Sequence, residues 1–490
     1  MIELREEIFI ADLFKKRVAS GVVVLGIRKV ILQLMLTLTS IILARILLPE
    51  IFGAFGIISF LILTFGLISN FGMGPALVQY KGAVTKGHLQ SIFTLLFIAS
   101  LLFVSFVYVF APVINSLYRG QLGETGILWL RIFSFSVLLD HTATISMHLL
   151  QRNLDFHIFT FGEILTTLIT QIVTVTLVIV GFGLGGLVLG NLIGKLFAIV
   201  VFFVFRPWPI GLHFSRTDIK PFLPFGLNFQ MNNLINSFGG AVVPIVVGSL
   251  TGPRSVGFIN WAGGIKGASM APFETIERLI FPAVARAQDN HELLKNMVEK
   301  MLKLSCLLSF PLMAIIAGLA EPFIKIVYTE KWFPGLTTLY LSLVHGAFVL
   351  LGTLMMDVLL ALGKAKMVRN ISLFWAILQW ILTVPLVMVF GFNGVLVASI
   401  LVSVTLFVPL FKVKKTININ VSSHVVPYMI YAGITGCVMY ILQNVILIDS
   451  FVRLFIAGGL GIGVYAFLLL LFEKKTFKTD ILKLRKLIGR

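Results

Sequence analysis

The stretch VLGIRKVILQLML (residues 24–36) places Arg28 and Lys29 side by side in a run of aliphatic residues that continues to Ile46. About twenty apolar residues suffice for a helix to cross the hydrocarbon core of a membrane, so this run predicts a transmembrane helix. Charged side chains inside such a helix are costly and usually face a partner or a water-filled cavity. What these two cations meet therefore bears on both the fold and the function of the chain.

The composition of the whole chain is that of a polytopic membrane protein. Of its 490 residues, 58% are hydrophobic and 12% are charged, and the mean hydropathy is +1.01. A soluble protein carries about a quarter charged residues and does not expose so much apolar surface. Its two cysteines, Cys306 and Cys437, lie in apolar runs. We expect two small buried hydrophobic residues there, not a disulfide or a metal site.

Fourteen apolar segments predict an all-α polytopic membrane protein with about 14 transmembrane helices. The segments cover residues 18–47, 51–71, 89–113, 126–148, 157–180, 184–205, 221–250, 255–282, 301–320, 336–361, 369–390, 393–411, 424–447 and 452–472. With a cytoplasmic N-terminus, about two thirds of the 39 Lys and Arg residues fall in cytoplasmic segments. This bias predicts that both termini are cytoplasmic. It also explains the net charge of +18 as a topology signal rather than as a nucleic-acid-binding surface.

An internal repeat predicts how the helices are grouped. The sequence PEIFG (49–53) recurs as PRSVG (253–257), and the glycine-containing links 181–186 and 391–394 have a similar offset. These matches predict two pseudo-symmetric six-helix lobes plus two extra C-terminal helices. The predicted parts are an amphipathic cytoplasmic segment (1–17), an N-lobe with helices 1–6 (18–205), a cytoplasmic linker (206–220), a C-lobe with helices 7–12 (221–411), helices 13–14 (412–472) and a basic cytoplasmic tail (473–490).

Several function classes lose support from the sequence. The outer links are short, which disfavours a membrane polymerase or ligase with a large external site. The sequence GNLIGKL (190–196) has one residue too few for a phosphate-binding loop and ends on Leu where that loop needs Ser or Thr. Gly186, Gly190 and Gly194 instead predict a face for close packing against a neighbouring helix. We expect no enzyme, no cofactor and no metal.

Four cations lie deep in the predicted spans: Arg28, Lys29, Lys195 and Lys266. Arg28 and Lys195 each lie eleven residues from a cytoplasmic end, which is about 16 Å. Four other charges lie near span ends, where the cost of burial falls, and were discounted: Arg131, Asp140, Glu163 and Asp357. The deep acids are Glu274 and Glu277, and Glu274 is placed to pair with Arg278 along one helix face.

This excess of deep cations has two interpretations. The cations line a water-filled cavity for an anionic substrate, or they pair across helices and fix the packing. The seventh span adds a row of amides that suits contacts to sugar hydroxyls or hydrogen bonds between helices: Asn228, Gln230, Asn232, Asn233 and Asn236. Glu274, Glu277 and Asp357 are candidates for coupling to a proton or a sodium ion.

Three stretches carry a resemblance to a known family. ARILLPEIFGAFG (44–56) and GLISNFGMGPALVQ (66–79) resemble the opening of the Wzx-type oligosaccharide flippases, or polysaccharide-transporter family. The stretch GPRSVGFINWAGGIKG (252–267), continuing to FPAVARAQD (281–289), is similar to the eighth-helix region of the same family. That family belongs to the multidrug/oligosaccharidyl-lipid/polysaccharide exporter superfamily. The cationic residues of its lumen vary among members, so the resemblance assigns no ligand in this chain.

The resemblance implies a flippase that exports undecaprenyl-diphosphate-linked oligosaccharide across the bacterial inner membrane by alternating access. Its product would feed the assembly of O-antigen, capsule or exopolysaccharide, with membrane lipids and a polysaccharide polymerase as further partners. The last two helices would help to form a groove for the lipid tail. Two alternatives stay open: a multidrug/cation antiporter of the same superfamily, and a non-transporting scaffold for glycan-assembly enzymes.

Overall fold

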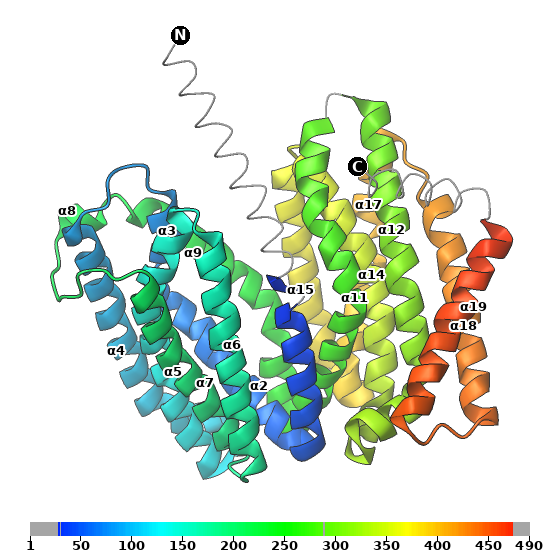
Figure 1. The fold of residues 1–490 in the computed structure, drawn as a ribbon, viewed down its shortest axis with the longest axis horizontal. Coiled ribbons are helices and arrows are strands. Elements are labelled where there is room, and N and C mark those ends of the chain that lie inside the picture. The colour runs from blue at the N-terminus through cyan, green and yellow to red at the C-terminus, as the bar shows by residue number, and fades with distance from the viewer. Residues whose placement is uncertain (1–27, 30, 288–289, 474–490) are drawn as a thin grey trace. The chain divides into compact units, whose positions relative to one another are not determined.

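The computed structural model describes residues 28–29, 31–287 and 290–473. Helices make up the regular structure, and these residues contain no strand, which confirms the predicted all-α class (Figure 1). Nine described helical stretches, or ten if one bent pair is a single span, are long and apolar enough to cross a membrane. The chain is therefore a multi-pass membrane protein, and the number of fourteen crossings stays a prediction. Segment 1–17, and the tail beyond Glu473, lie outside the described residues.

The chain divides into two compact units, Met1–Gly257 and Phe258–Arg490. The first unit contains the helices Ile31–Ile46, α2 (Pro49–Asn70), α3 (Met73–Gln79), α4 (Lys86–Leu117), α5 (Gly123–Arg152), α6 (Phe156–Ile179), α7 (Leu184–Phe205), α8 (Arg216–Ile219), α9 (Leu223–Gly240), η1 (Val243–Val247), α10 (Gly248–Thr251) and the first turn of α11 (Pro253–Ala287). The second unit contains the rest of α11, α12 (His291–Gly318), α13 (Ala320–Phe323), η2 (Ile324–Tyr328), η3 (Glu330–Gly335), α14 (Leu336–Ala361), α15 (Ala365–Phe390), η4 (Gly391–Asn393), α16 (Gly394–Val404), α17 (Phe407–Ile417), α18 (Val421–Val445) and α19 (Phe451–Phe472).

Helices α6 and α7 pack closely through the glycines of α7. A Cβ atom on Gly190 would lie 2.1 Å from the hydroxyl oxygen of Thr174, and one on Gly194 would lie 1.9 Å from that of Thr170. Small residues at this spacing allow two backbones to approach, which a larger side chain would prevent. The predicted packing face on α7 is confirmed, with α6 as its partner.

The two copies of the repeated Pro-x-x-x-Gly sequence contact each other through their backbones. A Cβ on Gly53 would lie 1.6 Å from the carbonyl oxygen of Pro253, and one on Gly257 would lie 2.0 Å from the carbonyl oxygen of Pro49. The first turns of α2 and α11 therefore meet at a distance that only glycine permits. The repeat marks a reciprocal contact, in which each glycine receives the other copy's proline carbonyl.

The predicted linker 206–220 packs on α4 of the first unit. Trp208 is buried, and its ring meets that of Phe93 edge-on at 5.2 Å. The backbone amide of His213 donates to the hydroxyl of Thr94 at 3.0 Å, and that of Ser215 donates to the hydroxyl of Ser91 at 3.0 Å. These contacts hold the chain between α7 and α9 against the N-terminal half of α4.

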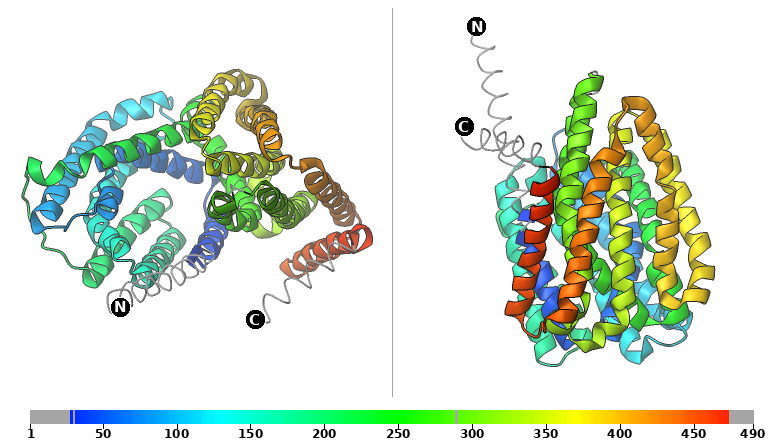
Figure 2. Two further views of the ribbon diagram at one scale, coloured as in Figure 1. Left: turned by 90° about the horizontal axis from the view of Figure 1, so that it is seen from above. Right: turned by 90° about the vertical axis from the view of Figure 1, so that its right-hand side faces the viewer.

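In the second unit, α18 packs against α12 and α19 (Figures 1 and 2). A Cβ on Gly318 of α12 would lie 2.5 Å from the carbonyl oxygen of Gly436 in α18. Cys306 of α12 is buried, as expected, but Cys437 is exposed on α18. The expectation of burial was wrong for Cys437, because α18 meets α12 through Gly436 and Met439, and Cys437 lies outside this contact.

Candidate functional site

Lys195 of α7 forms an ion pair with Asp140 of α5 inside the first unit. Gly194 lies on the face of α7 that packs against α6. The next residue, Lys195, lies about 100° further round the helix, and its side chain reaches α5. The side chain of Lys195 is 22% exposed and that of Asp140 is 47% exposed. The cation is therefore largely enclosed, and one side of the carboxylate is open.

Polar groups continue from this ion pair towards α4. His141 is 2% exposed, and its Nδ1 atom lies 2.6 Å from the hydroxyl oxygen of Ser100. The charges of Asp140 and Lys195 both act on the His141 ring. Ser100 of α4, Asp140 and His141 of α5, and Lys195 of α7 therefore form a polar layer that connects three helices of the first unit.

Arg28 forms an ion pair with Glu163 of α6. The guanidinium carbon of Arg28 also lies 5.3 Å from the centre of the Phe159 ring, one turn before Glu163. Phe159 is buried in a small cluster with Leu150 and Phe202. This combination of an ion pair and a cation–π contact joins Arg28 to α6. Lys29 is half-buried beside Arg28.

The acidic partners of Arg28 and Lys195 are Glu163 and Asp140, which the sequence predicts to lie near span ends. Asp140 was counted as near the end of a span, but α5 continues to Arg152, so Asp140 lies twelve residues inside the helix. Glu163 lies seven residues after the beginning of α6. Within this unit the structure therefore brings two of the predicted cations to carboxylates, as the packing interpretation expects. A comparison of the depths of acidic and basic residues in neighbouring spans could have predicted these two ion pairs from the sequence.

Lys266 lies on α11 in the second unit, and its surroundings differ from those of Arg28 and Lys195. Its aliphatic stem packs against Gly346 of α14, where an added Cβ would lie 3.0 Å from the lysine Cγ. The charge of Lys266 acts on the neighbouring His345, whose Nδ1 atom is buried without a hydrogen-bond partner among the described residues. Within the described residues, Lys266 forms no ion pair with a carboxylate.

Lys266 and His345 form one polar level between α11 and α14, and Glu277 and Asp357 form a second. Their carboxyl groups interact electrostatically, and both side chains are half-buried. Glu277 lies eleven residues after Lys266, and Asp357 lies twelve residues after His345. The two levels are therefore about 16–18 Å apart along the helices. Glu274 is one turn from Glu277, and the side chain of Arg278, its predicted partner, lies outside the described part.

The amide row of α9 is divided between different environments. Gln230 is 5% exposed, and its amide donates to the backbone carbonyl of Leu67 in α2 at 2.6 Å. Asn228 and Asn232 are exposed, and the Asn232 amide donates to the Asn228 carbonyl at 3.2 Å. Asn233 is half-buried, and the side chain of Asn236 lies outside the described part. Gln230 thus joins two helices, whereas Asn228 and Asn232 present surface amides.

Comparison with known proteins gives matches in both sequence and fold. Residues 42–336 match the family described as polysaccharide biosynthesis protein. The chain is 24% identical over 312 residues to the teichuronic acid biosynthesis protein TuaB of Bacillus subtilis (strain 168), and the match covers 63% of each chain. The chain thus spans less than two thirds of the length of this relative.

Two solved structures share the fold. The lipid II flippase MurJ in its inward closed conformation aligns with a TM-score of 0.73 and 15% identity, covering 92% of this chain and 99% of that chain. The inward-facing conformation of a multidrug resistance MATE family transporter of the MOP superfamily aligns with a TM-score of 0.62 and 16% identity, covering 78% of this chain and 95% of that chain.

The chain is a multi-pass helical membrane protein whose fold is similar to those of MurJ and of this MATE family transporter. Because the family match covers more than half of its length, the chain belongs to the polysaccharide biosynthesis protein family. The resemblance stated from residues 44–79 and 252–289 is thereby confirmed.

Proposed function

We propose that this protein is a flippase for undecaprenyl-diphosphate-linked oligosaccharide. It moves the headgroup across the bacterial inner membrane by alternating access between two six-helix lobes, with both termini cytoplasmic, and it performs no catalysis. Membership of the polysaccharide biosynthesis protein family and the MurJ-like fold support this proposal. The product would enter the assembly of a surface polysaccharide such as O-antigen, capsule or exopolysaccharide.

The environment of Lys266 is the observation that supports an anionic substrate. A half-buried ammonium group in a membrane helix is costly unless an anion compensates for its lost hydration. Arg28 and Lys195 have carboxylate partners, whereas Lys266 has none among the described residues. A diphosphate that enters beside Lys266 would supply the missing charge through short, charge-assisted hydrogen bonds. His345, with its free ring nitrogen, stands beside this position.

The other predicted site residues take secondary parts in this proposal. Lys195 is paired with Asp140, and Arg28 is paired with Glu163. Each of these cations would therefore contact a diphosphate while it also interacts with its carboxylate partner. Lys29 remains a candidate contact for an anionic headgroup. Asn228, Asn232, Asn233 and Asn236 are candidates for sugar contacts, whereas the hydrogen bond of Gln230 to Leu67 favours a structural role.

Coupling to a proton or a sodium ion is proposed for the acidic level of the second unit. The carboxyl groups of Glu277 and Asp357 interact across α11 and α14, and acidic residues inside membrane helices commonly serve ion pathways and proton relays. Glu277 and Asp357 are therefore the stronger candidates, with Glu274 one turn away. Flipping that ignores an imposed proton or sodium gradient would contradict this assignment.

The proposal is tested by chemical analysis of cells in which the gene is deleted and the glycan pathway is active. Extraction should reveal a build-up of a completed polyprenyl-diphosphate oligosaccharide, which the wild-type protein relieves. Lys266→Met should leave the build-up in place, and Lys266→Arg should relieve more of it than Lys266→Met. Lys300→Met, which removes an exposed lysine from α12, serves as the matched control. Relief by Lys266→Met equal to that by the wild type would return this lysine to structure.

A multidrug/cation antiporter is the second candidate, favoured by one observation. The Glu277–Asp357 level is an acidic site inside the second unit, which suits a cationic substrate. The same deletion decides between the two functions. An antiporter predicts no build-up of lipid-linked saccharide and a changed sensitivity to cationic drugs. A non-transporting scaffold predicts that build-up is relieved by variants in which all four predicted cations are neutralised.

A further inference from the structure

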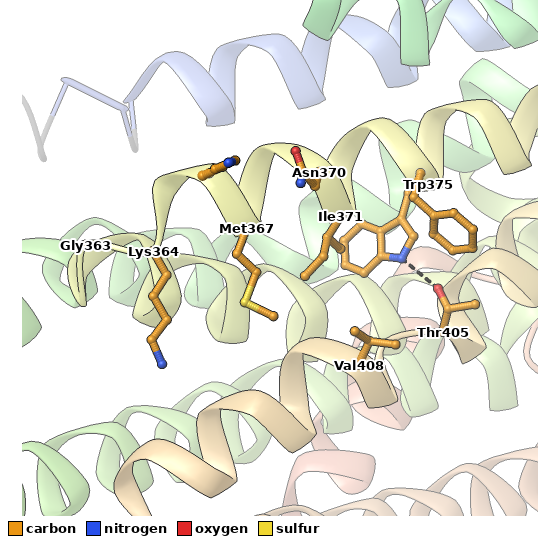
Figure 3. Close-up of a pocket in the computed structure, with 10 residues that line it drawn as sticks. Gly363, Lys364, Met367, Asn370, Ile371, Trp375, Thr405 and Val408 are labelled. Atoms are coloured by element: carbon orange, nitrogen blue, oxygen red, sulfur yellow. Dashed lines mark hydrogen bonds between the residues drawn. The ribbon is translucent and has the colours of Figure 1, made fainter.

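A groove lies along the N-terminal half of α15, opposite the break between α16 and α17 (Figure 3). Its volume is about 610 Å³. The break at Thr405 and Leu406 provides one wall, and the indole nitrogen of Trp375 donates to the hydroxyl of Thr405 at 2.6 Å across the groove. This hydrogen bond fixes the Trp375 ring as part of the lining.

One end of the groove is cationic. Gly363 has a φ of +76° and reverses the chain after α14, which brings Lys364 and Lys366 to the mouth of the groove. The ammonium group of Lys364 donates to the hydroxyl of Thr416 on α17 at 2.7 Å and so spans the opening. Lys366 is exposed. Asn370 is the next polar residue of the lining, and none of the described residues that line the groove is acidic.

The other end of the groove is apolar. Met367, Ile371, Phe374 and Val408 line it together with the ring of Trp375 (Figure 3). Lys364 and Trp375 are eleven residues apart, which corresponds to about 16 Å along a helix. One leaflet of a hydrocarbon core of about 30 Å is about 15 Å thick. A ligand that fills the groove therefore has an anionic group at the membrane surface and a hydrocarbon chain about one leaflet long.

We propose that this groove binds an anionic glycerophospholipid of the leaflet that the charge bias predicts to be cytoplasmic. The phosphate meets Lys364, Lys366 and the Asn370 amide, and one acyl chain lies between Met367, Phe374 and Val408. A free phosphate would leave the apolar lining exposed, and a neutral lipid would leave the two ammonium groups without a counter-charge. A bound lipid of this kind fills the space between α15 and α17 and joins the two helices where the α16–α17 span is broken.

The groove belongs to the second unit alone and is separate from Lys266, so this inference does not depend on the transported substrate. Quenching of Trp375 fluorescence by lipids with brominated acyl chains tests it in the full-length protein reconstituted into phosphatidylcholine vesicles. The chain has six tryptophans, so the Trp375 signal is the difference between the wild type and Trp375→Phe. Brominated phosphatidylglycerol and brominated phosphatidylcholine are compared at equal mole fractions.

The expected result is a preference for phosphatidylglycerol at Trp375. Each lysine near the surface adds about fivefold to the attraction of an anionic lipid, so the two together give about 25-fold. Lys364→Gln/Lys366→Gln should remove this preference, and Lys366→Gln alone should reduce it. Lys412→Gln/Lys414→Gln should retain it, because these exposed lysines of α17 lie outside the groove lining.

Three results would overturn the inference. Equal quenching by the two lipids in the wild type would show that the groove does not select an anionic headgroup. A preference that persists in Lys366→Gln and in the double variant would show that these lysines do not bind the phosphate. Relief of quenching by unlabelled undecaprenyl phosphate, at a mole fraction where unlabelled phosphatidylglycerol has no effect, would assign the groove to the polyprenyl carrier. Failure of build-up in the deletion strain would contradict the proposed function and leave this inference standing.

Discussion

Lys195 of α7 and Asp140 of α5 form an ion pair in the middle of the first unit, between helices that also contact α6 and α4. A pair of this kind adds little stability relative to apolar residues of the same size, because both charges lose hydration. Loss of one partner costs more, since the remaining charge stays enclosed without compensation. The ion pair therefore makes the first unit dependent on both residues together.

Lys195→Met should destabilise the protein by about 1–3 kcal/mol. This is less than the loss of a fully buried pair, because the Asp140 side chain is 47% exposed and partly screened by solvent. Lys195→Met/Asp140→Asn should recover much of the loss. Thermal unfolding of the purified protein, followed by intrinsic fluorescence, measures both effects. Additive losses in the double variant would mean that the two residues do not stabilise each other. A stable double variant that fails to export would show a functional role.

Gly53→Val should prevent the first turn of α2 from meeting the first turn of α11. The added Cβ would overlap the carbonyl oxygen of Pro253, and neither backbone can move without disturbing its helix. We expect destabilisation by more than about 3 kcal/mol and a loss of folded protein. The control is Gly458→Ala in α19, where an added Cβ meets nothing within 4 Å, so stability should change by less than about 1 kcal/mol. The amount of monodisperse protein extracted from membranes is the readout. Equal yields for the two variants would contradict the close contact.

Arg152→Ala should loosen the end of α3 and the segment that follows it. The guanidinium group donates to the backbone carbonyls of Leu77 at 2.8 Å and Gly82 at 2.8 Å, and also to that of Tyr80. Charge-assisted hydrogen bonds are stronger than neutral ones, so local opening should become easier by about 1–2 kcal/mol. Hydrogen exchange of residues 73–85 should therefore accelerate about five- to thirtyfold. Arg369→Ala is the control, because the described hydrogen bonds of that exposed side chain go to its neighbour Asn370. Unchanged exchange in Arg152→Ala would contradict the prediction.

The predicted orientation can be tested with reporter insertions in two links. Alkaline phosphatase, which is active only outside the cytoplasm, should be active after Asp449, between α18 and α19. It should be inactive after Asn418, between α17 and α18. Only one predicted span, 424–447, lies between the two insertions, so the pair tests whether this segment crosses the membrane. Equal activity at both positions would contradict the arrangement of the last two helices.

Helix positions and one helix contact could be predicted from the sequence, because both depend on local patterns. Hydropathy located the helices, and the four-residue spacing of Gly186, Gly190 and Gly194 located the face of α7 that packs on α6. The Pro-x-x-x-Gly repeat predicted a duplication, which stays a prediction. That its two copies touch each other depends on the tertiary arrangement and could not be read from spacing.

The candidate site was predicted less completely than the helices. Residue types and depth identified Lys195 and Lys266 as unusual, but the partner of a charge depends on which face of each helix meets its neighbour. The underestimated length of α5 also moved Asp140 towards a span end. The structure separates Lys195, which has a carboxylate partner, from Lys266, which has none among the described residues. This difference was not visible in a count of deep charges.

Transport of the lipid-linked headgroup by the purified protein is the most direct test of the proposed function. Full-length protein is reconstituted into vesicles that contain a fluorescent polyprenyl-diphosphate oligosaccharide, and a membrane-impermeant glycosidase cleaves the headgroups on the outer surface. We predict cleavage of nearly all headgroups with the wild type, and a plateau near half with Lys266→Met at the same protein content. A plateau near half with the wild type, under every ion gradient applied, would contradict the proposal that this protein is a flippase.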